Sequence, residues 1–296
     1  MKSGGTVRLN KPIYAKVLRS YDCPCMSAKM TVLLEKEMPK IREVFINCDG
    51  KQIFRGFLDK QVFDKNEKGA FLHIEARGVA SYLIDNEAVP NAFYNVNLKR
   101  IFDKYIGGYN NFKNRISSRA RAYEVFIGKG RSEWEAFCHG SLIITGKTPY
   151  MRGDRYIVCG YFDTKHIIEK NVLGMRQIYN PSKIISAVIM RDENGRYTRI
   201  YQNNHPESKG IYRKRYYIEP KEWENQKGLS AKEVFEKSLE DICLSEIILD
   251  GFFDYEVGDT VIFHGEELVI KEMTAEFSAG KVQTKILCCY INDFNK

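Results

Sequence analysis

The feature that most constrains the fold of this chain is a hairpin signal near residue 50. Asp49-Gly50 lies between two segments, 41–48 and 51–64, in which apolar and polar side chains alternate. A two-residue type I′ turn needs positive φ, which glycine accepts freely, so Asp-Gly between alternating segments predicts an antiparallel hairpin. Gly56 lies inside the second strand, where it predicts a bulge or a close backbone approach.

Further strands surround this hairpin in the sequence. Residues 27–39 alternate in the same way, and Phe71 to Arg77 forms another alternating segment before the chain turns helical at 79–85. About five short strands in the first 80 residues, separated by close turns, are typical of a small antiparallel barrel or sandwich.

The next part of the chain has helical periodicity. Ser132 is an N-cap candidate, and Glu135 three residues later completes a capping box. A turn at Gly153-Asp154 then joins two strands. An earlier helix ends at Gly107-Gly108 and has one apolar face, made of Leu98, Ile101, Phe102 and Ile106. These signals predict a small α/β segment.

Strands resume from about residue 178. Asn194-Gly195 predicts a second hairpin, and Ser230 with Glu233 predicts another capped helix. Between them, residues 203–228 are polar, basic and rich in Tyr, as in an excursion from the sheet. Three closing strands are predicted with turns at Gly258-Asp259, Gly265-Glu266 and Ala279-Gly280. The chain therefore reads β, then α/β, then β again.

Length and charge narrow the class of protein. The 296 residues are enough for two or three domains, and we find no signal peptide and no apolar run long enough for a membrane helix. We therefore expect a protein that is made and stays soluble in the cytosol. The net charge of +8 is uneven, with one basic stretch at 99–131 and a second at 212–217. Arg interleaved with Tyr can bind nucleic acid, but it equally fits a solvated surface or a face for an acidic protein partner.

No residue pattern predicts catalysis. The eight cysteines, Cys23-Pro24-Cys25 and Cys288-Cys289 included, lack zinc spacing, and we expect reduced thiols that mostly act as small hydrophobes. Cys138 and His139 are adjacent on a predicted helix, so they point about 100 degrees apart and cannot pair as nucleophile and base. "GKGRSE" at 128–133 precedes a helix and could hold an anion. We predict no catalytic, cofactor-binding or metal-binding residues.

The order of these elements resembles the baseplate hub proteins of phage tails, tailocins and related contractile injection machines. The resemblance rests first on a strand, a DG-type turn and a strand with Gly56 and Asp59. It continues through Ala76-Arg77-Gly78, Leu83, Pro90 and the helix from Leu98 to Ile106. The segments "GRSEWEAFCHGSLIITG" and "YEVGDTVIF" with "ELVIKEMTAEFSAGKVQTKILC" are similar to later parts of the family.

The resemblance implies a mainly β (α+β) fold, with two tube-like small β-barrels and an intervening small α/β domain. The first barrel would span 1–92 and the α/β domain 93–165, with 203–248 as a candidate addition to it. The second barrel would combine 166–202 and 249–296. No long C-terminal extension follows, so we expect no fused peptidoglycan-cleaving domain.

The resemblance further implies a virion structural protein without enzymatic activity. Three copies would form a ring of six similar barrels, a symmetry adapter that connects the tail tube to the central spike. The implied partners are the tube, the spike and other baseplate proteins, together with transient contact with DNA in the lumen. Two alternatives stay open: a nucleic-acid-binding module on small barrels, and a cell-wall hydrolase with a dispersed site.

Overall fold

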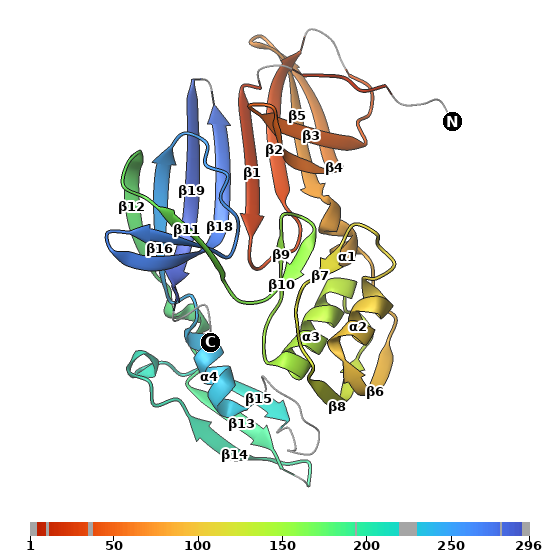
Figure 1. Cartoon of the computed structure of the whole chain (residues 1–296), viewed down its shortest axis with the longest axis vertical. Helices are drawn as coiled ribbons and strands as arrows, with labels where there is room; N and C mark the ends of the chain where they lie inside the picture. Colours follow the sequence, from red (N-terminus) through yellow and green to blue (C-terminus); the bar gives the residue numbers. More distant parts are fainter. Residues whose placement is uncertain are drawn as a thin grey trace.

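The computed structural model describes residues 5–9, 12–34, 38–192, 194–218, 230–278 and 280–291. Strands make up most of the regular structure, and the helices are short (Figure 1). The chain is therefore mainly β, as the sequence predicts.

One large sheet runs through the molecule in the order β12-β16-β19-β18-β1-β2-β5-β4-β3, with β17 and β11 attached beside β18. Its early strands are β1 (Tyr14–Ser20), β2 (Ser27–Leu34), β3 (Glu43–Cys48), β4 (Lys51–Asn66) and β5 (Gly69–Gly78). Its late strands are β11 (Phe162–Ile167), β12 (Val172–Tyr179), β16 (Cys243–Asp250), β17 (Asp259–Phe263), β18 (Glu266–Ser278) and β19 (Lys281–Tyr290). Strand β1 is antiparallel to both β2 and β18, so the first strand of the chain joins the two halves (Figure 1).

The turn predicted at residue 50 is confirmed. Asp49 has a φ of 47° and Gly50 a φ of 80°, which places both in the left-handed region that a type I′ turn requires. Strands β3 and β4 pair antiparallel on either side of it. Strand β4 is longer than predicted and pairs with β5, with a bulge between Leu58 and Lys60.

Other turns follow the sequence with small shifts. The turn between β17 and β18 falls at His264-Gly265, one residue earlier than predicted, because both residues adopt positive φ and Glu266 already pairs in β18. Strands β18 and β19 pair as far as Ser278 and Lys281, and Ala279 lies outside the described residues.

The α/β unit lies beside the early half of the large sheet (Figure 1). It contains η1 (Val79–Ser81), α1 (Tyr82–Asp85), β6 (Asn91–Asn97), α2 (Leu98–Tyr105), β7 (Lys113–Asn114), β8 (Arg121–Ile127), α3 (Glu133–Thr145), β9 (Tyr150–Arg152) and β10 (Tyr156–Val158). The capping box predicted for α3 is present, with reciprocal bonds between Ser132 and Glu135. Helices α2 and α3 cover one face of the β6–β8 pair and enclose a shared apolar core.

A third unit is a small sheet with one helix. Strands β13 (Ala187–Arg191), β14 (Tyr197–Gln202) and β15 (Lys214–Ile218) form it, together with α4 (Ala231–Leu239) and the short η2 (Pro181–Lys183) and η3 (Pro206–Ser208). Helix α4 has the predicted capping box between Ser230 and Glu233. The hairpin of β13 and β14 thus forms a separate sheet with β15. Strands β12 and β16, which come before and after this unit in the sequence, pair with each other in the large sheet.

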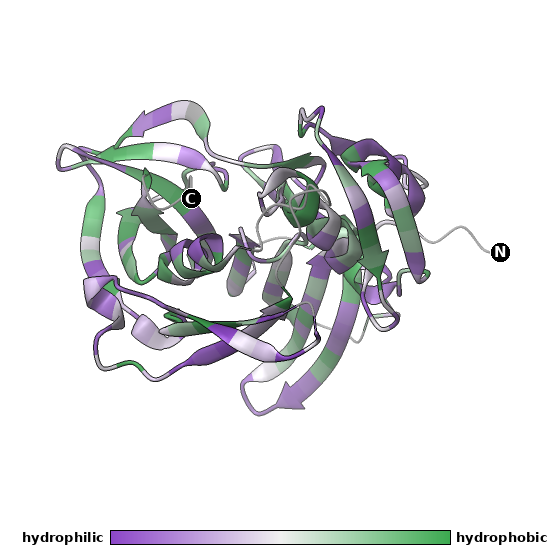
Figure 2. Cartoon of the chain, turned by 90° about the horizontal axis from the view of Figure 1, so that it is seen from below, coloured by the Kyte–Doolittle hydropathy of each residue, from purple (hydrophilic) through white to green (hydrophobic). Residues whose placement is uncertain are grey.

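The large sheet has two apolar cores although its hydrogen bonding is continuous. The early core includes Val17, Phe54, Leu72 and Ile74, and the late core includes Ile247, Val261, Ile270 and Ile286. Hydrophobic and hydrophilic residues alternate along many strands, as expected where one face is buried (Figure 2). The sheet is therefore one continuous hydrogen-bonded ladder with two lobes. We call the part around the early core the early lobe and the part around the late core the late lobe.

Strand pairing does not close a barrel within the described ranges. The large sheet ends at β12 and β3, and β11 pairs only with β17. The two tube-like barrels and the domain limits therefore stay predictions.

Candidate functional site

Two residues singled out from the sequence, Asp59 and Arg77, meet Asp85 where β4, β5 and α1 come together. Arg77 donates to the Asp59 carboxylate at 2.7 and 3.1 Å and to the Asp85 carboxylate at 2.8 and 3.0 Å. These hydrogen bonds raise the pKa of the Arg77 guanidinium. The three side chains are 34%, 37% and 48% exposed, so the cluster lies at the surface and not in a closed polar pocket.

Gly56 shows the close backbone approach that was predicted for it. It pairs with Val44 on one side and with Gly78 on the other. A Cβ atom built on Gly56 would lie 2.1 Å from the carbonyl oxygen of Arg77. Gly56, Asp59 and Arg77 therefore shape the corner between the hairpin and α1.

A second cluster, which the sequence did not reveal, lies where the two lobes and the α/β unit meet. We call the segment between β1 and β2, residues 21–26, the junction loop. Tyr21 packs against Tyr150 of the α/β unit, with ring centroids 4.9 Å apart, and under the ammonium of Lys271 from β18, 3.8 Å from the ring centroid. At the other end of the loop, the Met26 carbonyl accepts from the Gly78 N–H at 2.7 Å.

Arg19 joins both lobes beside this loop. Its Nη1 donates to the Glu256 carboxylate at 2.5 Å, and its Nη2 donates to the Ile53 carbonyl at 3.2 Å. Its Nε lies 3.2 Å from the Met26 sulfur. The side chain of Arg19 is only 11% exposed and that of Glu256 22%, so little solvent screens this pair.

Further carboxylates line the same junction. Burial raises the pKa of Glu256, while Arg19 and Arg152 oppose the shift. Arg152 donates to Asp259 at 2.5 Å, and His166 Nε2 lies 3.0 Å from the other oxygen of that carboxylate. The bonds from Arg19 to Glu256 and from Arg152 to Asp259 join elements distant in the sequence, so they link the early lobe and the α/β unit to the late lobe.

Asp154 has two roles in this cluster: it lies in a turn, and its carboxylate caps the start of η1. It has a φ of 53° in the predicted Gly153-Asp154 turn, and its Oδ2 accepts from the Val79 N–H at 3.2 Å, at the start of η1. Its Oδ1 is buried and has no hydrogen-bond partner among the described residues. Burial raises the pKa of Asp154 to about 6, against opposing hydrogen bonds from the backbone of Val79 and Ala80.

This raised pKa predicts a pH-dependent stability. Below the unfolded pKa of 3.8 both states are protonated, and stability is then lost as pH rises through about 6. The loss is about 3 kcal/mol at most, since one pKa unit corresponds to about 1.4 kcal/mol. Asp154→Asn should flatten this part of the profile, measured by urea unfolding between about pH 4 and 7. Asp64→Asn, at an exposed position, should keep the wild-type slope; an unchanged slope in Asp154→Asn would contradict the assignment.

The residues considered for catalysis do not form a site. Burial raises the pKa of the Cys138 thiol, and burial with the nearby Arg131 lowers the pKa of His139 to about 4. Cys138 is therefore a protonated thiol beside a neutral imidazole on one helix. The anion considered at the start of α3 is also disfavoured, because Glu133 and Glu135 occupy its first turn. Within the described residues, no group of three or more His, Cys, Asp or Glu side chains could hold a metal.

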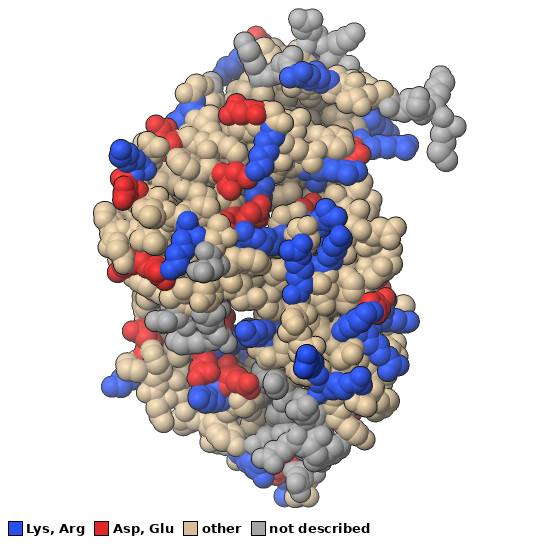
Figure 3. All heavy atoms as spheres, in the orientation of Figure 1, with Lys and Arg blue, Asp and Glu red and all other residues tan. Residues whose placement is uncertain are grey.

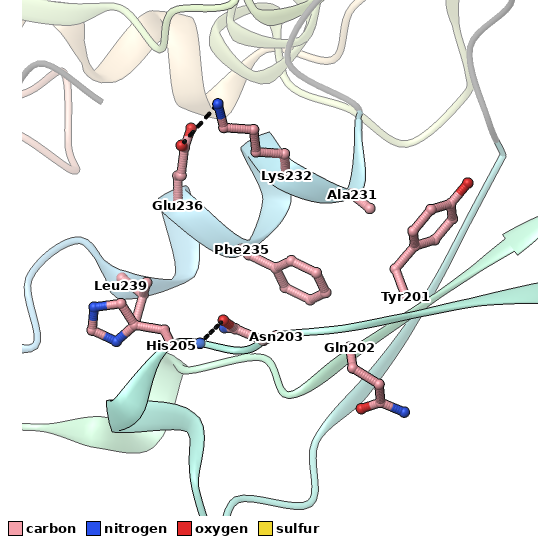
Figure 4. A pocket seen from close by; sticks show the side chains of 9 residues that line it. All are labelled: Tyr201, Gln202, Asn203, His205, Ala231, Lys232, Phe235, Glu236 and Leu239. Atoms are coloured by element: carbon pink, nitrogen blue, oxygen red, sulfur yellow. Dashed lines mark hydrogen bonds and ion pairs between the residues drawn. The ribbon is translucent and has the colours of Figure 1, made fainter.

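A groove of about 410 Å³ lies between α4 and the end of β14 (Figure 4). Phe235 points from the helix toward the strand, and Lys232 pairs with Glu236 on the helix at 3.8 Å. Asn203 accepts from the His205 N–H at 3.0 Å, and His205 in turn accepts from the Glu207 N–H at 3.3 Å. Asn203 and His205 thus bond the backbone of their own turn, and Lys232 and Glu236 pair with each other on the helix.

The basic stretches are dispersed by the fold. Residues 99–131 span α2, β7, β8 and their connections, and Lys99 pairs with Asp103 at 2.5 Å. In the second stretch, Arg213 donates to the Ile184 carbonyl at 2.6 Å, whereas Tyr212 is 95% exposed. Figure 3 shows Lys and Arg gathered over the region where β9 and β10 meet the large sheet, with acidic side chains close by. This face carries mixed charge and no continuous basic groove.

The edges of the large sheet carry exposed apolar side chains. On β12, which among the described strands pairs with β16 alone, these are Val172, Leu173, Met175 and Tyr179. At the opposite end, Phe45 on the edge strand β3 is 48% exposed. An edge strand presents unpaired backbone groups that can pair with another chain. These edges are candidate assembly surfaces.

Comparisons with known proteins connect this fold to phage tails. No protein-family model and no curated protein sequence matches the chain. Among solved structures, the tail protein from Neisseria meningitidis MC58 superposes with a TM-score of 0.74 at 13% identity, over 96% of this chain and 94% of that chain. The 43 kDa tail protein of prophage MuSo2 from Shewanella oneidensis gives 0.69 at 14% identity, over 96% of each chain.

A third match comes from a secretion machine. The E. coli c3393 protein, a component of the type VI secretion system with structural similarity to T4 bacteriophage tail proteins gp27 and gp5, gives a TM-score of 0.59 at 8% identity. The match covers 95% of this chain and 73% of that chain. At such identities the likeness shows the fold, and it confirms at that level the resemblance to phage tail and baseplate proteins. None of the described helices has the length and apolar character needed to cross a membrane.

Proposed function

We propose that this chain is a structural component of a phage tail or phage-tail-like particle, and more specifically its baseplate hub. The observation that carries the proposal is the end-to-end match to two tail proteins, which spans at least 94% of each chain in both cases. A shared fold alone does not fix a function. The geometry of the sheet supplies the further support.

The two lobes fit a hub that adapts symmetry. In the proposed ring, three copies each present two similar units, giving six units toward a sixfold tube and three subunits toward a threefold spike. Two apolar cores on one continuous sheet support this division. We propose the first barrel around β1 to β5 and the second around β12 and β16 to β19. The α/β domain lies between them in the sequence, and the small α4 unit is inserted between β12 and β16.

The exposed edge strands support assembly through the large sheet. A ring of identical subunits needs a heterologous interface in which one surface meets a different one on the next copy. Edges β12 and β3 lie at opposite ends of the sheet and both carry exposed apolar side chains. We propose that such edges pair with neighbouring subunits or with tube and spike proteins, in a virion tail, without an enzymatic role.

Mass measurement by size-exclusion chromatography with light scattering tests this proposal. We expect a trimer, either for the isolated chain or on co-expression with the tube and spike proteins. The double variant Leu173→Asp, Met175→Asp should stay folded and lose assembly, because both residues are exposed on β12 and charges there oppose strand pairing. Tyr212→Asp, at a 95% exposed position away from this edge, is the control and should assemble normally.

Two outcomes would contradict the hub. One is a chain that forms no complex with itself, tube or spike proteins under any of these conditions. The other is a monomer that binds single-stranded DNA with an affinity that falls steeply with salt, which would favour the nucleic-acid-binding alternative.

A further inference from the structure

The junction loop holds two thiols that the proposed assembly role does not use. Cys23 and Cys25 flank Pro24, and their sulfur atoms lie 3.6 Å apart. Cys25 is 7% exposed and packs in the core of the α/β unit, while Cys23 is half-buried at the rim of that core. Cys23 is therefore the more exposed of the two residues, and Cys25 is the one held in the core.

We propose that Cys23 and Cys25 form a reactive dithiol site that small-molecule disulfides, such as oxidised glutathione, convert to an intramolecular disulfide. The proposal is independent of whether the chain is a baseplate hub. Cys23 is the attacking thiol, and Cys25 is the resolving thiol.

The backbone of the loop permits the bond. The Cα atoms of residues i and i+2 are at most about 7 Å apart, and a disulfide needs its two Cα atoms within about 6.8 Å of each other. Bends at Pro24 and Cys25 shorten this span, and proline fixes one backbone angle between the two sulfurs. The sulfurs have only to close from 3.6 Å to a bonding distance of about 2 Å.

The surroundings favour a thiolate on the outer sulfur. The hydrogen bond between the two thiols, with a smaller contribution from the charge of Arg77, lowers the pKa of Cys23, although burial opposes the shift. The same hydrogen bond and burial raise the pKa of Cys25. The two thiols thus differ in role, since the accessible one ionises first and the buried one keeps its proton.

The reaction balances with a disulfide oxidant. The Cys23 thiolate attacks one sulfur of oxidised glutathione, forming a mixed disulfide and releasing one glutathione thiolate, which takes up a proton. Cys25 then loses its proton to solvent and attacks the Cys23 sulfur, which releases the second glutathione. Two thiols are oxidised and one disulfide is reduced. The Cys23 thiolate, whose negative charge raised the pKa of Cys25, is consumed in the first step. Cys25 therefore loses its proton more easily in the second step.

The bond would crosslink a loop on which three parts of the molecule meet. Tyr21 and Met26, at its two ends, contact the α/β unit, β18 and the end of β5. A reducing cytosol keeps the dithiol open, and an oxidising medium outside the cell closes it. The site thus responds to the compartment in which the protein is found.

The test uses the full native chain in glutathione buffers of varied redox ratio. After acid quenching, free thiols are alkylated and the peptide with both cysteines is weighed by mass spectrometry. We expect Cys23 and Cys25 to become protected from alkylation as the ratio of oxidised to reduced glutathione rises. In the native chain this should occur at a ratio at least tenfold lower than in the urea-unfolded chain. Exposed Cys243 is the internal control and should form no intramolecular bond. Equal closure in native and unfolded chains, or no closure in excess oxidised glutathione, would overturn the proposal.

A pH profile separates the roles of the two thiols. The alkylation rate of Cys23 should level off at a lower pH in the native chain than in the urea-unfolded chain. Cys25→Ala should shift the Cys23 midpoint upward and trap the mixed disulfide with glutathione, because the hydrogen-bond donor and the resolving thiol are both removed. A Cys23 profile that is the same in the native and the unfolded chain, or is unchanged in Cys25→Ala, would show that the two thiols do not act together.

Discussion

Replacing Gly56 with alanine is expected to destabilise the protein by about 3 kcal/mol or more, in the range of the most disruptive core substitutions. The added Cβ atom would lie 2.1 Å from the carbonyl oxygen of Arg77 and 2.7 Å from the end of the Phe54 ring. The ring can move, but the carbonyl belongs to β5 and is held by the strand pairing on both of its sides. Strands β4 and β5 must therefore separate locally.

Urea unfolding of Gly56→Ala beside wild type measures this effect. Gly174→Ala is a matched control, since Gly174 also lies in a strand and a Cβ atom added there would meet no atom within 4 Å. That control should change stability by no more than about 0.5 kcal/mol. If the two variants unfold at the same urea concentration, the close approach at Gly56 has no energetic consequence.

Replacing Arg19 with methionine should cost about 3 kcal/mol at neutral pH, because it leaves the Glu256 carboxylate in the junction without its closest cation. The variant also removes the bond from Arg19 to the Ile53 carbonyl in the early lobe, and with it the link through Arg19 to Glu256 in the late lobe. Arg152 cannot replace Arg19, since it already bonds Asp259 at 2.5 Å and the Val257 carbonyl at 2.8 Å.

The pH dependence of Arg19→Met distinguishes this cause from lost packing. Arg19 opposes the upward pKa shift that burial imposes on Glu256, so the pKa of Glu256 should rise further in the variant. The stability of the variant is then highest where Glu256 is protonated in both states, and it is lost as pH rises through the raised folded pKa. A loss of stability that is equal at about pH 4 and pH 7 would indicate packing instead.

The control for this variant is Lys29→Met. It removes the same charge from a pair with Glu75 at 3.7 Å, in which the side chains are 64% and 47% exposed. Exposed pairs of this kind contribute about 0 to 1 kcal/mol, so the control should differ little from wild type at either pH.

Local signals in the sequence predicted the structure correctly where the cause of a feature lies within a few residues of it. The turn at Asp49-Gly50 and the capping boxes at Ser132 and Ser230 were all predicted, because each depends on residues within a few positions. Gly56 was also identified, although its partner was not. A glycine inside an alternating strand indicates that something approaches, but not which carbonyl does so.

The junction could not be predicted in the same way. Arg19 and Glu256 are separated by more than 200 positions, and nothing near either residue indicates the other. Asp154 was expected only as a turn residue, yet its carboxylate also caps η1. The Cys23-Pro24-Cys25 motif was visible, but its meaning depends on the 3.6 Å between the sulfurs and on the core behind Cys25.

The sequence by itself determined the strands, the turns, the helix caps and the mainly β class, since alternation and turn chemistry act over short distances. Only the tertiary structure decided that β1 lies between β2 and β18 and so joins both lobes in one sheet. The physical reason is that backbone pairing is much the same for any two strands. Which strands become neighbours is set by the burial of whole sheet faces and by contacts between residues far apart in the sequence, such as those of Arg19. These contacts exist only once the chain has folded.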